Sequence, residues 1–262
     1  MIIDFHTHIF PDSLAQRAVS KLAGVSGIPN QTNGTLQDTL DKMTLWGVDM
    51  AVCHHIATKP NQEPTINAWA ITTASEQIVP FAALHWQSDQ VLDRVTEIKE
   101  RGFHGIKLHP DYQGFEINDR RLYPIYELCG ELGLILMFHA GFDYVSPDFV
   151  HAAPRASAEV IREFPQCKIV LAHLGGFDQW DEVEECVAGK DVYLDTAMCA
   201  GRIDPVLMKR IIAKHDPDKI LFGSDCPWQT ARENLEFLER LNLSSSAMEK
   251  IRSENARRLL NL

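Results

Sequence analysis

Eight short apolar runs alternate with helical patterns along the whole chain. Each run holds a few apolar residues, many of them β-branched, and ends on a polar residue or a glycine, which is typical of a buried parallel strand. The runs cover residues 1–8, 48–56, 78–86, 103–109, 133–140, 167–174, 191–197 and 219–225. Eight alternating strand–helix units predict an α/β protein that folds as a closed (β/α)8, or TIM, barrel.

The segments between the runs show helical spacing of apolar residues. Leu36, Leu40 and Met43 share one face, and further helices are predicted over 157–164, 180–188, 204–214 and 230–241. Ser88 is expected to cap the helix that follows the third run. A capping box of Ser246 and Glu249 is expected in the last helix. No linker or low-complexity segment interrupts the alternation, so the chain is predicted to be one domain over residues 1–262.

Six residues that can bind a metal ion or an anion stand at the ends of these runs. They are His6, His8, Lys107, His139, His173 and Asp225. A single histidine at a strand end is more often a hydrogen-bonded structural residue than a ligand. The joint pattern points to a metal site, because a His-x-His pair presents both rings on one face and a histidine and an aspartate follow on later strands.

The order of these residues also bears on the fold. They come from the first, fourth, fifth, sixth and last runs, whereas an open doubly wound sheet would gather its ligands at a single crevice. A closed barrel places the first and last strands side by side. By alternation Asp4 is expected to point with His6 and His8, deeper in the barrel, where it could support a ligand histidine.

Composition narrows the function. The 262 residues carry a formal net charge of −11, which argues against nucleic acid and anionic membranes as partners. No apolar run is long enough to span a bilayer, and the N-terminus lacks the pattern of a secretory signal. The six cysteines are irregularly spaced and are read as reduced thiols. We therefore expect a cytoplasmic enzyme that acts on a small molecule, as a monomer or a homo-oligomer.

The chain resembles the amidohydrolase superfamily, and within it the amidohydrolase 2 family of metal-dependent barrel hydrolases and decarboxylases. The resemblance runs from end to end, through "IIDFHTHIFP", "GIKLHP", "KIVLAHLGG", "LFGSDCPW" and "ENARRLLNL". It implies that His6, His8, His139 and Asp225 bind a divalent ion, most often zinc, with His173 beside the metal-bound water. Lys107 stands where members with two ions carry a carboxylated lysine. One Zn²⁺ is preferred here, and two remain an alternative if Lys107 is carboxylated.

These residues support a hydrolytic mechanism. Asp225 and His173 are the expected catalytic groups: Asp225 to move the proton of water and His173 to orient water or stabilise an oxyanion. The expected substrate-binding groups are Lys107, His109, Arg155 and Arg202.

The preferred function is hydrolysis of an amide, lactone or ester bond in a small carboxylated substrate by a metal-activated water. The alternative is a metal-dependent non-oxidative decarboxylase of a small unsaturated or aromatic acid. Phosphoester cleavage and a non-enzymatic binding role are weaker hypotheses, since the chain is acidic and no ligand is missing.

Overall fold

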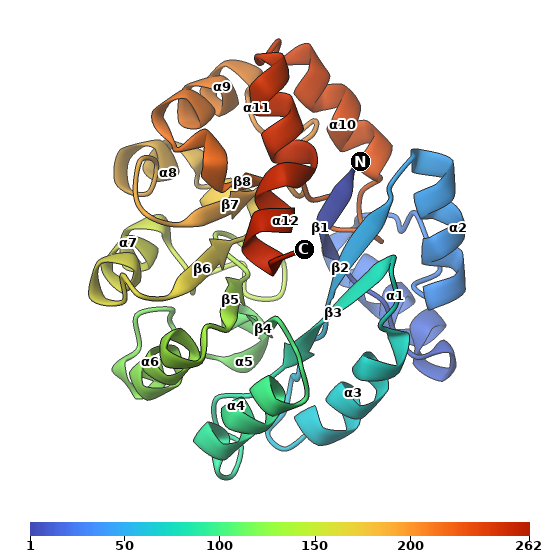
Figure 1. The fold of residues 1–262 in the computed structure, drawn as a ribbon, viewed down its shortest axis with the longest axis vertical. Helices are drawn as coiled ribbons and strands as arrows, with labels where there is room; N and C mark the ends of the chain where they lie inside the picture. The colour runs from blue at the N-terminus through green and yellow to red at the C-terminus, as the bar shows by residue number, and fades with distance from the viewer.

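The computed structural model describes residues 1–262, which form a barrel of eight parallel strands inside a ring of helices (Figure 1). The strands are β1 (Ile3–Thr7), β2 (Met50–His54), β3 (Ile78–Ala83), β4 (Gly105–Leu108), β5 (Ile135–Phe138), β6 (Lys168–Leu171), β7 (Tyr193–Asp195) and β8 (Ile220–Leu221). Each lies within one of the eight predicted runs and pairs with the next strand in sequence. The predicted (β/α)8 barrel and its single domain are confirmed.

Helices follow the strands and pack around them. They are α1 (Asp12–Ser26), α2 (Leu36–Trp46), α3 (Glu63–Ala70), α4 (Val91–Glu100), α5 (Pro110–Gln113), α6 (Tyr123–Leu132), α7 (Pro154–Glu163), α8 (Trp180–Cys186), α9 (Pro205–Lys214), α10 (Ala231–Arg240), α11 (Ser245–Glu249) and α12 (Asn255–Leu260). None of them is both long and apolar enough to cross a membrane. The helices predicted over 157–164, 180–188, 204–214 and 230–241 are present as α7, α8, α9 and α10, with ends that differ by a few residues, whereas α1 and α3 were not predicted.

Both predicted serine caps are wrong. The Ser88 hydroxyl accepts the N–H of Asn61 at 2.8 Å, and so ties down the loop after β2 instead of capping α4. In α11 the capping residue is Ser244, whose hydroxyl accepts the N–H of Ala247. In both cases another serine or a loop contact competes for the same hydrogen bond, which sequence spacing alone does not resolve.

Side chains from the strands form two apolar layers. Alternate residues such as Ile106 and Leu108 of β4 face outward, into the large cluster shared with the helices. The others face inward and fill the barrel; Phe5 and Phe81 meet there edge to face with ring centroids 5.7 Å apart. This interior is a packed core, as expected for a barrel of eight strands.

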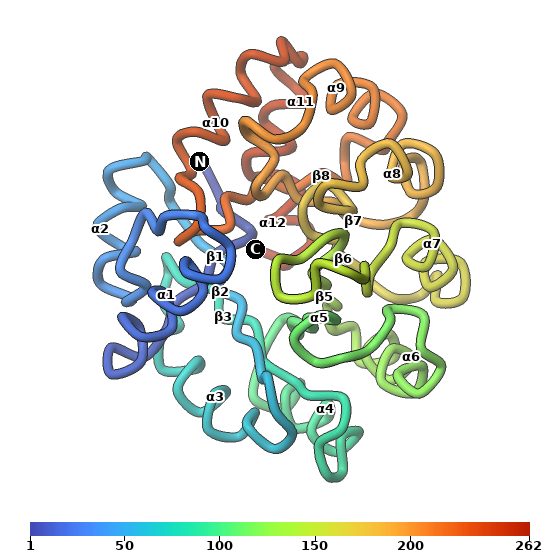
Figure 2. The backbone as a smooth tube through the Cα atoms, turned by 180° about the vertical axis from the view of Figure 1, so that it is seen from behind, coloured from blue at the N-terminus to red at the C-terminus, as the bar shows by residue number.

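The last helix closes one end of that core. Leu259 and Leu260 of α12 belong to the interior cluster, and the Asn255 amide donates to the carbonyls of Pro217 and Ile220, where β8 begins. In Figure 1, α12 lies across the middle of the ring of strands. Figure 2 shows the opposite face, where loops that follow the strands surround the centre. A site formed by strand ends therefore lies on the face in Figure 2.

The barrel closes between β1 and the segment that follows β8. The N–H of Phe5 donates to the carbonyl of Phe222 at 2.8 Å, and the N–H of Asp225 donates to the carbonyl of His6 at 2.8 Å. The Asp4 carboxylate reinforces this seam, accepting the Ser224 N–H at 2.9 Å and the Ser224 hydroxyl at 2.5 Å. Asp4 is buried, so it joins β1 to the segment after β8 in the interior of the protein.

A bulge in β1 corrects the expected direction of Asp4. The pairing with β2 shifts between Asp4 and Thr7, so that Thr7 faces outward with its hydroxyl on the Val52 carbonyl. His6 and His8 then share the inner face, as predicted, but Asp4 lies before the bulge and does not point with them. An extra residue in a strand reverses the alternation that follows it, and bulges next to active sites re-aim side chains in this way.

The seam yields a prediction about stability. Asp4→Ala leaves the Ser224 N–H and hydroxyl buried without an acceptor, which should lower the free energy of unfolding by about 2–5 kcal/mol. Urea denaturation followed by circular dichroism measures the change. Asp41→Ala, on the exposed face of α2, is the matched control and should change stability little. Equal stability of the two variants would contradict the role assigned to Asp4.

Candidate metal centre

Three of the four predicted metal ligands meet at the seam. His6 lies in β1, His8 directly follows it, and Asp225 follows β8. The Oδ1 atom of Asp225 lies 3.3 Å from His6 Nε2 and 3.1 Å from His8 Nε2. These three atoms all lie within 4.8 Å of one another. The main-chain hydrogen bond from the Asp225 N–H to the His6 carbonyl explains how residues at the first and last strands come together.

The other ring nitrogen of each histidine is already occupied. His6 Nδ1 lies 2.8 Å from Asp195 Oδ2, and His8 Nδ1 donates to the carbonyl of His54 at 3.0 Å. With its proton on Nδ1, an imidazole in the neutral form presents the lone pair of Nε2 toward Asp225. Three acceptors facing one another repel unless a cation lies between them. Nitrogen and oxygen donors at this spacing suit a divalent ion such as zinc, so the residues present fit the expected group.

His139, the fourth predicted ligand, directly follows β5 and does not belong to the cluster of His6, His8 and Asp225. Its Nδ1 is 3.1 Å from His173 Nε2, and its Nε2 is 3.6 Å from Asp143. His173 stands between it and His6, with ring centroids 4.8 Å and 5.1 Å away respectively. The structure thus groups His139 with His109 and Asp143 instead of with the three residues at the seam. Its role as a ligand stays a prediction.

Two residues of the site have strained backbones. Asp225 has φ of +67° and His173 has φ of +58°, in the left-handed region that side chains other than glycine rarely occupy. The turn after His173 continues through Leu174 at φ +54° and is relieved at Gly175, where φ is +88°. The following Gly176 has an extended backbone, with φ of +169°. Such strain clusters at functional sites.

Burial and charge set the ionisation of these groups. Burial would raise the pKa of Asp225, but its electrostatic interactions with the adjacent His6, His8 and His173 outweigh burial and lower it below its ordinary value. Burial lowers the pKa of His6 well below its usual range, and burial with the nearby His139 lowers that of His173 to about 4. Near neutral pH the Asp225 carboxylate is therefore ionised and the rings of His6 and His173 are neutral, and these are the forms of such groups that bind metal ions.

Lys107 faces the same space from β4. Its amine lies 3.5 Å from His6 Nε2 and pairs with no carboxylate, although the side chain is buried. Burial lowers its pKa to about 8 against the opposing charges of Asp195, Asp225 and Asp143. Lys107 lies between Ile106 and Leu108, which pack outward, so alternation along β4 directs Lys107 to the inside of the barrel. Lys107 is therefore a buried amine without an anionic partner in contact.

The remaining substrate-binding candidates differ in their positions. His109 is stacked between Tyr112 and His139, with centroids 4.0 Å and 4.3 Å from its own. Arg202 is exposed at the rim, where it donates to the Tyr144 hydroxyl at 3.1 Å and lies over the Phe177 ring. Phe177 in turn contacts His173.

Arg155 does not join these groups. Its exposed guanidinium lies 3.3 Å from Glu182 and 3.9 Å from Glu185, so it pairs α7 with α8. Because Arg155 follows the fifth run in the sequence, it was expected in a loop at the rim of the site. It lies instead in the first turn of α7, and its side chain points toward α8.

Sequence reasoning missed three acids around the site. Asp195 ends β7, Asp111 lies in α5, and Asp143 follows β5. The Asp111 Oδ1 accepts the Ser146 hydroxyl, and its Oδ2 is buried without a partner. The signal for Asp195 was present, because it is a polar residue near the end of the seventh run, 191–197. The other two lie in segments after the strands, where periodicity gives no direction.

Comparison with known proteins agrees with this geometry. The chain resembles solved structures of a 4-oxalomesaconate hydratase from Rhodopseudomonas palustris (22% identity, TM-score 0.68, 100% of this chain and 96% of that one). It also resembles a 2,6-dihydroxybenzoate decarboxylase from Rhizobium (16%, 0.71, 99% and 98%). A third is a probable 2-pyrone-4,6-dicarboxylic acid hydrolase from Acinetobacter baumannii (13%, 0.71, 100% and 99%).

At these identities the likeness shows the fold. No curated protein matches the chain. The sequence model of one family, described as Amidohydrolase, matches residues 3–262. The protein therefore belongs to the amidohydrolase 2 family, whose members with a barrel of this kind are metal-dependent enzymes.

Proposed function

We propose that this protein is a metal-dependent hydrolase that cleaves an amide, lactone or ester bond in a small carboxylated molecule. The observation that carries the proposal is the convergence of His6 Nε2, His8 Nε2 and Asp225 Oδ1 at the barrel seam, next to the unpaired amine of Lys107. His139 is the proposed fourth ligand, and zinc is the proposed ion.

Each residue has a distinct part in the proposed reaction. A divalent ion at the seam would polarise the scissile carbonyl and lower the pKa of water. Asp225, ionised and beside the ligand histidines, accepts the proton of the attacking water and passes it to the leaving group. His173 holds its ring proton on Nδ1 toward the Ala197 carbonyl, so its Nε2 can accept a hydrogen bond from the attacking water and orient it. Lys107 binds the substrate carboxylate.

The positions of the arginine and lysine side chains favour hydrolysis over decarboxylation. A decarboxylase must clamp an acid while carbon is protonated, and arginine suits that task because its fork matches a carboxylate. Here Arg155 is paired with α8 and Arg202 lies at the rim, which leaves Lys107 as the buried cation of the site. The likeness to a protein named as a hydrolase agrees with this choice.

Decarboxylation of a small unsaturated or aromatic acid is the second candidate. The same ligands serve both reactions, and Lys107 beside His6 would hold a carboxylate against the ion. The likeness to a protein named as a decarboxylase supports this alternative. The two reactions differ in their products, which makes them separable by one assay.

A substrate panel tests the choice of reaction. Zinc-loaded protein is incubated with lactones, esters and amides that carry a carboxylate, and with unsaturated and aromatic acids. We expect a product that has gained one water molecule, identified by mass, and no release of carbon dioxide. Carbon dioxide formed in step with substrate loss would replace hydrolysis by the lyase reaction. A His6→Ala, His8→Ala double variant is the control and should be inactive.

Metal analysis tests the ligands without any substrate. Purified wild-type protein should hold about one equivalent of divalent metal, and the His6→Ala, His8→Ala variant should lose it, since both ring nitrogens that face Asp225 are gone. His104→Ala, at the start of β4 and far from the seam, is the matched control and should keep its metal. Equal metal content in all three proteins would remove the proposed centre.

Lys107→Met tests the anion-binding role. Methionine keeps much of the stem and removes the charge, so kcat/KM on the identified substrate should fall at least about 30-fold, the equivalent of losing roughly 2 kcal/mol of a buried charge pair. Circular dichroism checks that the fold persists. Lys99→Met, on the exposed face of α4, is the control. Wild-type kcat/KM in Lys107→Met would show that the amine does not contact substrate.

A further inference from the structure

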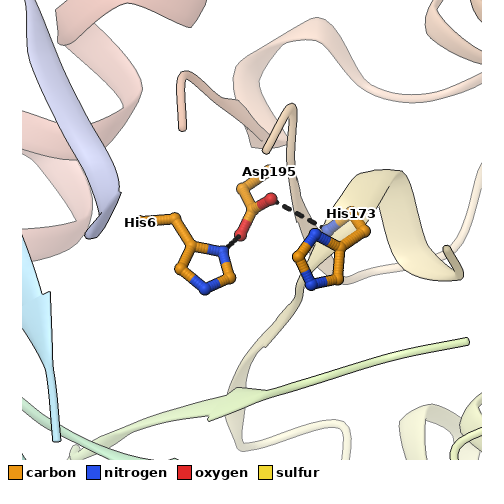
Figure 3. Close-up of side chains that lie close together, drawn as sticks. All are labelled: His6, His173 and Asp195. Carbon is orange, nitrogen blue, oxygen red and sulfur yellow. Dashed lines mark hydrogen bonds and ion pairs between the residues drawn. The ribbon is translucent and has the colours of Figure 1, made fainter. Parts of the chain in front are cut away.

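Asp195 connects two histidines of the site (Figure 3). It ends β7 and its side chain is wholly buried. Its Oδ2 lies 2.8 Å from His6 Nδ1, and its Oδ1 accepts the main-chain N–H groups of His173 and Ala197, each at 2.9 Å. One carboxylate thus holds a proposed metal ligand by its ring and a proposed catalytic residue by its backbone.

The two backbone donors fix which oxygen faces His6. They belong to the chain after β6 and β7, so they hold Oδ1 in place and leave Oδ2 directed at the ring. In its ionised form the Asp195 carboxylate has no proton to give, and His6 then carries its proton on Nδ1, 2.8 Å from Oδ2. The lone pair of Nε2 is then turned toward Asp225 and Lys107. Partners of this kind set the tautomer of ligand histidines.

The same strand end holds His173. The bond from its N–H to Asp195 secures a residue whose φ of +58° is otherwise unfavourable. Its Nδ1 donates to the carbonyl of Ala197 at 3.1 Å, and Ala197 is itself tied to Asp195 Oδ1. The ring is therefore oriented through Asp195 and Ala197, with Nε2 turned toward His139.

We propose that Asp195 is a positioning residue that sets the proton on His6 and the place of His173 together, so that the metal ligand and the catalytic residue keep a fixed relation. This proposal rests on the metal centre proposed above. The competing view is that Asp195 is one more buried hydrogen-bonded group that stabilises the barrel.

Asp195→Asn separates the two views. The backbone donors retain the amide oxygen, so the amide NH₂ faces His6 and forces the ring proton onto Nε2, the atom that would bind the ion. Nitrogen-15 NMR of histidine-labelled, metal-free protein, assigned with a His6→Ala variant, reports the tautomer. Competition with a chromophoric chelator reports zinc affinity. We expect the proton on Nδ1 in wild-type protein and on Nε2 in the variant, with Kd for zinc raised about 10–100-fold.

Thr196→Val is the matched control. Thr196 adjoins Asp195, is also buried, and its hydroxyl hydrogen-bonds the Gly223 backbone and no imidazole. It should keep the wild-type tautomer and a zinc Kd within about twofold of wild type, since the ligand orientation is intact. A purely structural role for Asp195 predicts that both variants lose stability and that neither moves the proton.

Two results would overturn the proposal: a proton on Nε2 of His6 in metal-free wild-type protein, or an Asp195→Asn variant with wild-type tautomer and zinc affinity. The wild-type measurement decides the matter even where the variant does not fold. Wild-type protein that carries the proton on Nδ1 but binds no zinc would instead overturn the proposed metal centre, so the two failures are distinguishable.

Discussion

The hydrogen-bonded seam between β1 and the segment after β8 is the contact on which the rest of the structure depends. It joins residues more than two hundred positions apart, and Asp4 and Ser224 meet across it. Contacts so distant in sequence carry the largest entropic cost of loop closure. The same bonds that complete the barrel bring Asp225 against His6 and His8. Closure of the fold and assembly of the site are therefore one event.

The site that results is locally unfavourable without an ion. Acceptor atoms of His6, His8 and Asp225 face one another, and Asp225 and His173 have left-handed backbones. The surrounding core supplies the stability that such features remove, because most strand residues follow the two-layer pattern. Proteins commonly break local rules at functional sites and compensate elsewhere.

The barrel itself does not select the reaction. Solved structures that share the architecture of this chain include proteins named as a hydratase, a decarboxylase and a hydrolase. Chemistry is decided by the side chains that surround the ligands. In this protein those include the unpaired Lys107, the stacked His109, and Asp143, whereas the available arginines lie at the rim or on the helices.

The sequence alone determined the order of elements and the residues that end the strands, because strand and helix periods are local properties of a chain. It therefore predicted the barrel, and it predicted that His6, His8 and Asp225 share one end of it. Only the tertiary structure decided directions that local periods do not contain. The bulge in β1 directs Asp4 to the seam, and the ion pair with Glu182 of α8 directs Arg155 away from the site. Asp195 became the partner of His6 because closure placed β7 within hydrogen-bonding distance of β1.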